Sequence, residues 1–476
     1  MWFFMNQKSS DMLENMNIKR LLITLSIPAT LGMMVNALYN LIDAFFVSKG
    51  AGQIALGALT LAFPVQIVIT AVGIMIGIGS ASVFSRAFGR KDYETMKTAV
   101  NTALRIDLLI AGLISIVGYI FLDELLVLFA ASESNVEYAK DYLGVILLGL
   151  VPLSLTIVMN NLARAEGRPK IAMITMMIGA GLNIILDPIF IFDFGLGLGV
   201  KGAAMATVIS QSIAFMYALF NALSPKSSLK IDVTNWLKIH LKTAKEILSI
   251  GLPTFVRNSI GAVLTIVILN LISFYSPGDS AIYTSIYGVI NRIMAFIFMP
   301  GFGLVQGLAP IAGFSYGAKN YKRLTDSVIF ATTLIMAYFA FGFIFIQLFA
   351  ESIFTAFSEE GNDTAFFISY GARSFKIISY GFLLLGLQIM LSSLYQALGY
   401  PIRALIVATS RQFWLFLPIA LVMTQLFALE GIWMTFAIAD ILAGLISFVM
   451  LRYELNIFKR KHREQVNQNS GLIMQV

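Results

Sequence analysis

Two aspartates, Asp43 and Asp187, lie within long apolar stretches of the sequence, where an ionisable side chain is costly and usually has a function. Asn183 precedes Asp187 by four residues, so its amide and the carboxyl group share one face of a helix. Carboxyl and amide oxygens suit Na⁺, and two neighbouring carboxyl groups in an apolar setting also favour binding of a proton. The sequence therefore predicts a site for H⁺ or Na⁺ at Asp43, Asn183 and Asp187. The alternative is that each aspartate lies at a helix end and simply reaches water.

Further side chains could line a cavity beside this site. Tyr39 lies one helical turn before Asp43, and Thr207 could add an oxygen ligand, although a lone threonine more often bonds its own helix. Pro28 lies well inside the first apolar stretch, where it removes a backbone hydrogen bond and allows a bend. The other cavity candidates are two amides that could equally serve helix packing and three methionines that could equally face lipid: Asn160, Asn161, Met33, Met173 and Met176.

The second half of the chain carries different charges. Its apolar stretches hold Arg257, Arg292 and Arg411 with a single acid, Asp440. We expect Asp440 to pair with one of these arginines, because an unpaired buried charge is strongly destabilising. The ion chemistry should therefore belong to the first half.

Three other charged groups of the first half are expected to have simpler roles. Arg105 and Asp107 fall near the start of an apolar stretch, so both should reach back to water. The run from Arg164 to Pro169, which contains Gly167, predicts a tight turn with a structural role.

The composition indicates which elements must hold these residues. Of the 476 residues, 58% are hydrophobic and 12% are charged, and the mean hydropathy is +0.82. A water-soluble fold cannot hide so much apolar surface, which excludes a soluble enzyme, a nucleic-acid-binding protein and a disordered chain. The sequence has no cysteine and only 2 histidines, both in polar stretches, so thiolate and histidine metal sites are not expected.

Apolar runs long enough to cross a bilayer, about 20 residues each, predict an all-α integral membrane protein with twelve transmembrane helices. The runs lie near residues 21–47, 55–85, 100–121, 141–162, 171–192, 202–223, 247–274, 282–314, 327–350, 374–397, 402–424 and 431–452. Most of the 33 Lys and Arg residues fall in alternate loops, and acids gather in the others. By the positive-inside rule, both termini should be cytoplasmic. The first residues lack the order of a cleavable signal peptide.

The two halves also resemble each other. The run Gly89 to Tyr93 recurs as Gly317 to Tyr321, and the run Leu162 to Ala172 recurs as Leu394 to Ala404 at nearly the same offset. Six spans per half preserve the orientation, which predicts two six-helix lobes related by a pseudo-two-fold axis along the membrane normal. The expected divisions are a cytoplasmic N-terminal segment (1–20), an N-terminal lobe (21–223), a cytoplasmic linker (224–245), a C-terminal lobe (246–452) and a basic cytoplasmic tail (453–476).

Together these features resemble the multidrug and toxic compound extrusion (MATE) family, and within it the DinF-like and MepA-like bacterial branch. The resemblance extends from about residue 17 to residue 455. Its motifs are Pro28 with Tyr39 and Asp43, Gly79 to Gly89, Arg164 to Pro169, Asn183 to Asp187, Gln306 to Pro310 and Tyr316 to Lys319.

This resemblance implies antiport of H⁺ or Na⁺ against organic cations, with ion ligands at Asp43, Asn183, Asp187 and Thr207 and a hinge at Pro28. The NorM-like branch of the family has acids in two spans of its C-terminal lobe. This sequence lacks them, which argues against a second cation site there.

The expected protein is a monomeric exporter of lipophilic cations that works by alternating access in the lipid of the bacterial inner membrane. No cofactor, nucleic-acid partner or enzymatic activity is expected, because no catalytic cluster and no Walker motif occurs. One alternative keeps the fold but changes the cargo to a lipid-linked oligosaccharide or another lipid. It requires arginines such as Arg257, Arg292 and Arg411 to face the cavity and bind phosphate.

Overall fold

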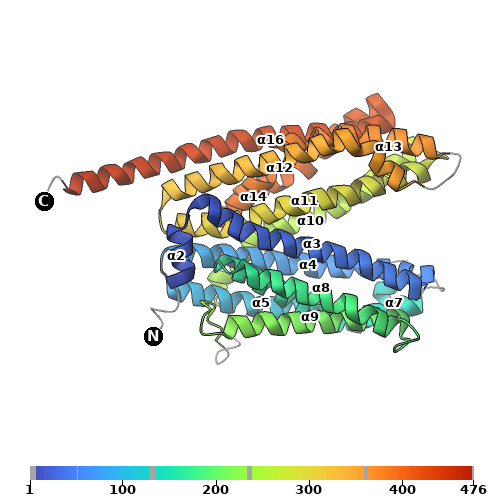
Figure 1. The fold of residues 1–476 in the computed structure, drawn as a ribbon, viewed down its shortest axis with the longest axis horizontal. Coiled ribbons are helices and arrows are strands. Elements are labelled where there is room, and N and C mark those ends of the chain that lie inside the picture. The colour runs from blue at the N-terminus through green and yellow to red at the C-terminus, as the bar shows by residue number, and fades with distance from the viewer. Residues whose placement is uncertain (1–6, 51, 129–135, 233–237, 359–362, 474–476) are drawn as a thin grey trace.

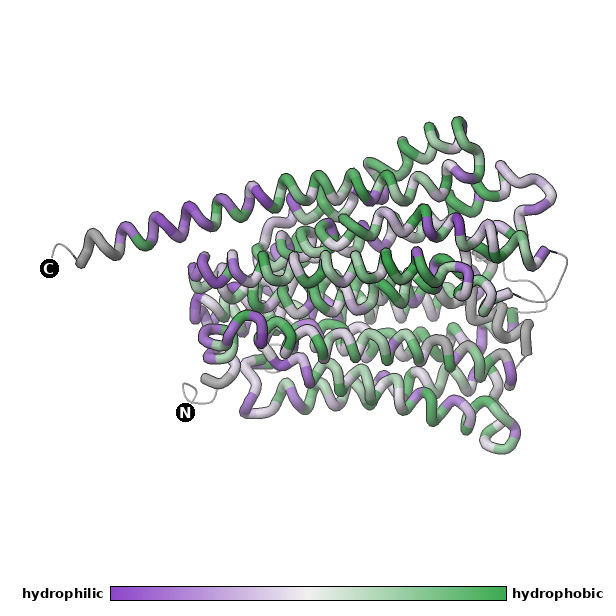
Figure 2. Tube along the Cα trace, turned by 45° about the horizontal axis from the view of Figure 1, so that its top comes forward, coloured by the Kyte–Doolittle hydropathy of each residue, from purple (hydrophilic) through white to green (hydrophobic). Residues whose placement is uncertain are grey.

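The computed structural model describes residues 7–50, 52–128, 136–232, 238–358 and 363–473. Residues 1–6 of the expected N-terminal segment and 474–476 of the expected tail lie outside these ranges. Within them the chain is helical and contains no strand. Apolar residues dominate the middle of the helices, and polar residues gather toward the ends of the bundle and along the protruding C-terminal helix (Figure 2). This pattern fits a multi-pass membrane protein, since helices satisfy their own backbone hydrogen bonds in lipid.

The first half of the chain forms a lobe of six long helices, here called the N-lobe (Figure 1). Its long helices are α3 (Ile18–Gly50), α4 (Gly52–Gly89), α5 (Tyr93–Ile120), α7 (Val136–Ala165), α8 (Pro169–Ile191) and α9 (Gly199–Leu223). Two short helices, α2 (Gln7–Asn15) and α6 (Leu122–Leu128), accompany them. Helix α3 packs against α8, and α4 packs against α7, which brings the expected ion-site helices together.

The second half forms the C-lobe (Figure 1). Its helices are α10 (Leu241–Tyr275), α11 (Ser280–Gly317), α12 (Tyr321–Ala356), α13 (Thr364–Ser379), α14 (Phe382–Leu398), α15 (Pro401–Thr409), the π-helical turn η1 (Ser410–Leu415) and α16 (Phe416–Ile473). Helix α11 packs against α3 and α4 of the N-lobe, so the two lobes share a central interface.

The last helical segment of the C-lobe crosses the bundle twice. It is 68 residues long, which would be about 100 Å as one straight helix and far exceeds a bilayer core of about 30 Å. The helix breaks at Ala428, whose φ of 49° is not helical. Residues on the two sides of the break pair in antiparallel order, Arg403 with Glu454 and Arg411 with Asp440. The segment is therefore two spans.

The twelve predicted spans can now be compared with the helices. Among the described residues, ten helical segments are long and apolar enough to cross a membrane, and α13 with α14, bent by 50°, would make an eleventh. Counting the segment that folds back at Ala428 as two spans gives the predicted twelve.

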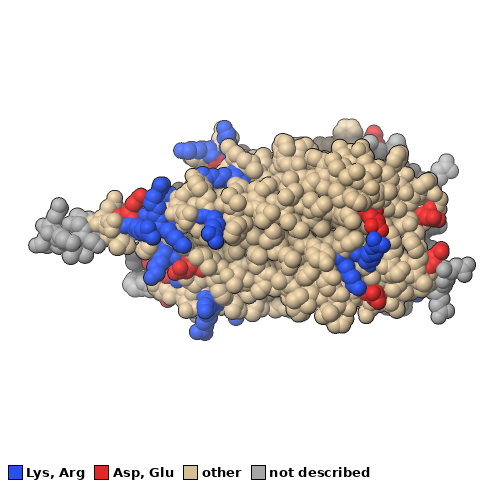
Figure 3. Space-filling view, turned by 90° about the horizontal axis from the view of Figure 1, so that it is seen from above, with Lys and Arg blue, Asp and Glu red and all other residues tan. Residues whose placement is uncertain are grey.

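Lys and Arg side chains gather at the end of the bundle from which α16 protrudes, here called the basic end (Figure 3). The two lobes contact each other at this end. Arg86 of α4 lies 2.9 Å from Glu246 of α10, and the Ser82 hydroxyl donates to the backbone carbonyl of Gln396 in α14. Gly79 packs directly on the backbone of α10, which leaves no room for a Cβ. The helices of the two lobes diverge toward the opposite end (Figure 1).

The chain between α9 and α10 is fastened to the N-lobe. The buried Glu166 carboxylate accepts a hydrogen bond from the backbone N–H of Ser228. Burial raises the pKa of Glu166, whereas this hydrogen bond favours its charged form. The Arg105 guanidinium donates to the carbonyls of Asp232 and Lys238. The expectation that Arg105 reaches water is therefore wrong, because the linker covers it.

Asp107 is also buried, and the expectation that it reaches water is wrong. Helix α5 begins at Tyr93, so Asp107 lies about 21 Å along the helix rather than in its first turn. Its side chain is fully buried. The Ser154 hydroxyl of α7 donates to Oδ1 at 2.7 Å, whereas Oδ2 has no hydrogen-bond partner in the described part of the chain.

Candidate functional site

The two predicted aspartates meet in the N-lobe. Asp43 comes from α3 and Asp187 from α8, and their carboxyl groups lie close enough to interact with each other. Helix α8 continues through Pro188 to Ile191, so Asp187 is enclosed by the helix bundle and is not exposed. Because an ionised carboxylate can only accept hydrogen bonds, a bond between two carboxyl groups requires a proton on one of them. The arrangement can therefore hold one proton between two helices.

Asn183 and Thr207 complete this cluster. The Asn183 Nδ2 group donates to Oδ1 of Asp187 at 3.0 Å and to the hydroxyl of Thr207 in α9 at 3.2 Å. Three buried acceptor atoms, Asp43 Oδ1, Asp187 Oδ2 and Asn183 Oδ1, have no hydrogen-bond partner among the described residues. Unpartnered buried oxygens are costly, and such atoms could accept a proton or contact a bare cation. The structure thus brings together all four predicted ion-coupling residues.

Two tyrosines surround the carboxyl pair. Tyr39 lies one turn before Asp43 on α3 and is close enough to both aspartates to interact with them electrostatically. Tyr142 of α7 is also close to the pair, and its side chain lies near Gln66 of α4. The sequence analysis missed Tyr142, because no polar residue at helical spacing within its own apolar run marks it.

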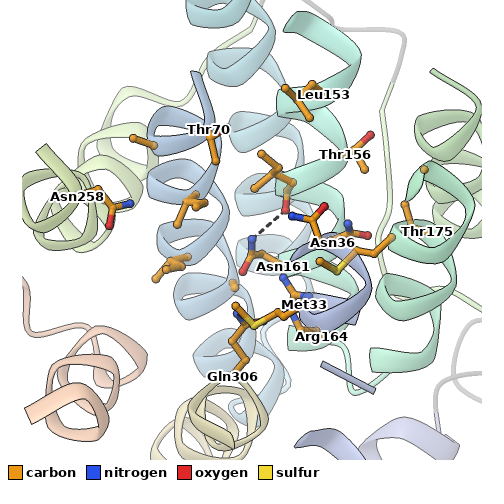
Figure 4. A pocket seen from close by; sticks show the side chains of 18 of the residues that line it. Met33, Asn36, Thr70, Leu153, Thr156, Asn161, Arg164, Thr175, Asn258 and Gln306 are labelled. Carbon is orange, nitrogen blue, oxygen red and sulfur yellow. Dashed lines mark hydrogen bonds between the residues drawn. The ribbon is translucent and has the colours of Figure 1, made fainter. Parts of the chain in front are cut away.

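A cavity of about 570 Å³ is lined by residues of both lobes (Figure 4). It reaches Thr207 at the edge of the carboxyl cluster. Six of the predicted residues line it, namely Met33, Tyr39, Asn160, Asn161, Met176 and Thr207. Among the described lining residues, Met173, Pro28, Asp43, Asn183 and Asp187 do not occur. Tyr39 and Thr207 therefore belong both to the cavity wall and to the surroundings of the carboxyl pair.

The cavity wall is apolar with interspersed amide groups. Asn161 donates to the carbonyl of Ile157 at 2.9 Å, and Gln306 donates to the Met33 sulfur at 3.3 Å. The oxygens Asn160 Oδ1 and Gln306 Oε1 have no partner within the described ranges. Arg164 is the one charged side chain among the described lining residues. The run from Arg164 to Pro169 thus has a structural part, Glu166, and a cavity-facing part, Arg164 in the last turn of α7, which the sequence analysis did not separate.

The sequence repeat is visible at the end of the cavity nearest the basic end. Asn161 and Arg164 of α7 line it from the N-lobe, and Ser393 and Gln396 of α14 line it from the C-lobe. Asn161 and Ser393 are separated by the same number of residues as Leu162 and its repeat Leu394, and so are Arg164 and Gln396. Equivalent positions of the two halves therefore face one cavity.

The arginines of the C-lobe do not face this cavity. Arg411 forms an ion pair with the fully buried Asp440, which confirms the predicted pairing. The Arg257 guanidinium lies over the ring of Phe302, 5.6 Å from its centroid. Arg292 is exposed, and none of the three arginines is among the described residues that line the cavity.

Comparisons with known proteins agree with this architecture. The chain is 28% identical to the multidrug export protein MepA of Staphylococcus haemolyticus over 453 residues, which covers 94% of this chain and 96% of that protein. The structure of the MATE multidrug transporter DinF-BH matches with a TM-score of 0.83 and 35% identity, covering 92% of this chain and 96% of that one. A transporter of the MOP superfamily from Pyrococcus furiosus, described as having a binding pocket of reverse polarity, matches with a TM-score of 0.86 and 26% identity, covering 95% and 99%. The sequence model of the MatE family matches residues 28–189 and 253–422. The chain is therefore a multi-pass membrane protein that belongs to the MatE family.

Proposed function

We propose that this protein is a multidrug exporter that moves lipophilic organic compounds, cations among them, out of the bacterial cell in exchange for protons. The observation that carries this proposal is the close approach of the Asp43 and Asp187 carboxyl groups beside the cavity. The names of the related MepA and DinF-BH proteins support multidrug export. The carboxyl pair supports coupling to protons, since the pair can hold a proton between two helices.

The proposal places the basic end, with both termini, in the cytoplasm, because lysine and arginine concentrate on that side of membrane proteins. The lobes touch at the basic end and diverge toward the opposite end. We assign this conformation to the step in which the cavity opens to the outside. The protein would act as a monomer in the inner membrane.

The proposed cycle uses the charge of the carboxyl pair. When both groups are ionised they repel each other, and together they attract a cation in the adjoining cavity. A proton from outside neutralises one group, lets the two side chains bond and halves the negative charge, which weakens that attraction, so the compound leaves. Rearrangement of α3 near Pro28 then releases the proton to the cytoplasm. Pro28 lies inside α3 and leaves the carbonyl one turn earlier without its usual donor.

Sodium is the second candidate ion, because three unpartnered oxygens lie in the cluster. The orientation of Asn183 favours the proton. Its N–H₂ group, and not its oxygen, points at both Asp187 and Thr207, which leaves fewer oxygens converging on one point.

The test is dye transport in proteoliposomes under an imposed pH gradient and, separately, an imposed Na⁺ gradient. Wild type is compared with Asp43→Asn, Asp187→Asn and a matched control, Asp279→Asn, which changes an exposed aspartate in the turn before α11. We expect the pH gradient to drive transport by wild type and the control. Both cluster variants should lose it by at least about 10-fold, since they lack an ionisable group.

Equal transport by the cluster variants would refute coupling at this pair. Transport driven by the Na⁺ gradient alone would replace the proton with sodium. The lipid-transport alternative is not supported by the positions of Arg257, Arg292 and Arg411, which lie away from the described cavity wall.

A further inference from the structure

Arg164 occupies a distinctive place in the cavity. It lies in the last turn of α7 and belongs to a stripe that also contains Ile157, Asn160 and Asn161, all of which line the cavity. Figure 4 shows its side chain near those of Met33 and Gln306, which come from α3 and α11. The guanidinium is therefore directed at the space between the lobes and not at the surface of the N-lobe.

This guanidinium has no counter-charge among the residues that the structure describes. Within the described residues, it forms no ion pair, and no charged side chain acts on it. Two acids at this end of the bundle pair with other cations: Glu166 with Arg168 at 3.5 Å and Glu246 with Arg86 at 2.9 Å. A cation removed from bulk water without a partner is unfavourable, so a residue in this position calls for an anionic partner.

The repeat supplies an internal comparison for a purely structural role. Gln396 occupies the position of the C-lobe equivalent to Arg164 and lines the same cavity. Its amide donates to the carbonyl of Ile250 at 3.2 Å and to the Thr254 hydroxyl at 2.8 Å, and thereby ties α14 to α10. No hydrogen bond of the Arg164 side chain to a described residue takes that place. The head group of Arg164 is thus free for something that enters the cavity.

We propose that Arg164 binds the oxyanion, foremost the carboxylate, of an amphiphilic compound in the cavity, so that the protein accepts zwitterionic and acidic compounds besides cations. The inference rests on the proposed export function and names a substrate class for it. A planar guanidinium forms two parallel hydrogen bonds with a carboxylate. The apolar wall around Ile157 and Met33 would hold the remainder of the molecule.

This oxyanion site is separate from the carboxyl pair. Arg164 lies at the basic end of α7, whereas Asp187 lies 18 residues beyond the first residue of α8, or about 27 Å along that helix. A drug-sized molecule cannot contact both groups at once. Loss of the oxyanion site should therefore change which compounds bind without changing how transport is coupled.

The experiment uses two forms of one dye, a rhodamine ethyl ester, which is a cation, and its free acid, which is a zwitterion. Binding is measured by fluorescence polarisation to purified full-length protein, and transport is measured in proteoliposomes. The variants are Arg164→Gln, which copies the residue of the C-lobe, Arg164→Lys, and the control Lys170→Gln. Lys170 is exposed at the start of α8, so the control removes a positive charge from the same end outside the cavity.

We expect Arg164→Gln to weaken binding of the free acid at least about 10-fold, because the carboxylate loses its charge-assisted hydrogen bonds. Binding of the ester should be unchanged or tighter, Arg164→Lys should be intermediate, and Lys170→Gln should match wild type. Equal effects of Arg164→Gln on the two forms would overturn the inference, while transport of the ester would leave the proposed function intact. If wild type neither bound nor transported either form of the dye, the proposed export function would be refuted, and this inference would be refuted with it.

Discussion

The two lobes share a fold but use their buried charges in opposite ways. In the C-lobe, the buried acid Asp440 is neutralised by Arg411. In the N-lobe, Asp43, Asp107 and Asp187 each retain an oxygen without a hydrogen-bond partner in the described part of the chain. A paired charge holds one geometry, whereas an unpaired carboxyl group can change its protonation and its partner. The comparison teaches that two lobes of one fold can differ in their buried acids: the described acid is paired in the C-lobe, whereas acids of the N-lobe keep unpartnered oxygens.

The largest expected effect is on the ion pair of the C-lobe. Asp440→Asn leaves the Arg411 guanidinium buried without a counter-charge and should lower the free energy of unfolding by about 3–5 kcal/mol. The double variant Arg411→Met with Asp440→Leu should recover most of this loss, because it removes both charges. Stability is measured by thermal unfolding in detergent. Loss of proton coupling by a stable double variant would contradict the division between the lobes.

A smaller effect is expected at Asp107 of the N-lobe. Ser154→Ala removes the hydrogen bond that α7 gives to this buried carboxyl group and should cost about 1–3 kcal/mol of stability. The matched control is Ser115→Ala at the same α5–α7 contact, where the hydroxyl donates to the carbonyl of Leu147 and its loss should cost about 1 kcal/mol. Both are measured by thermal unfolding.

The ratio of protons to dye molecules sharpens this prediction. We expect the ratio to stay the same in Ser154→Ala, since Asp107 does not line the cavity among the described residues. A changed ratio would make Asp107 a third member of the ion site and would strengthen the contrast between the lobes.

The smallest effect is expected at Thr207. Its hydroxyl contacts Asn183 and not the carboxyl groups in the described contacts, so Thr207→Val should remove about 0.5–1.5 kcal/mol of hydrogen bonding. Proton-driven transport should slow only a few-fold in a proteoliposome assay. A much larger loss that is relieved by raising the Na⁺ concentration would identify Thr207 as a sodium ligand.

The sequence predicted those features that depend on the type of a residue together with its spacing along a helix. The spacing of Asn183 and Asp187 predicts a shared helix face, and the structure joins them to Asp43 and Thr207. The apolar runs predict the spans because the bilayer imposes their length. These features depend on local pattern and composition alone.

The facing of individual side chains could not be predicted in the same way. In a membrane, both the lipid-facing and the protein-facing surfaces of a helix are apolar, so periodicity does not identify the cavity side of α7. This is why Tyr142 was not recognised as a cluster residue. Arg164 lies at helical spacing from the predicted cavity residues Asn160 and Asn161, but it was interpreted as part of a turn because it begins the run that ends at Pro169. The burial of Asp107 was missed because α5 begins several residues before its apolar run.

The fastening of the linker limits how far the lobes can separate at the basic end. Arg105 holds the carbonyl of Lys238, and α10 begins at Leu241, so Ile239 and His240 are the only residues between that anchor and the C-lobe. Two extended residues reach about 7 Å. The linker therefore limits the separation of the lobes at this point. A wider separation requires that the hydrogen bond from Arg105 to the linker breaks first, which would add an energy barrier to opening at the basic end.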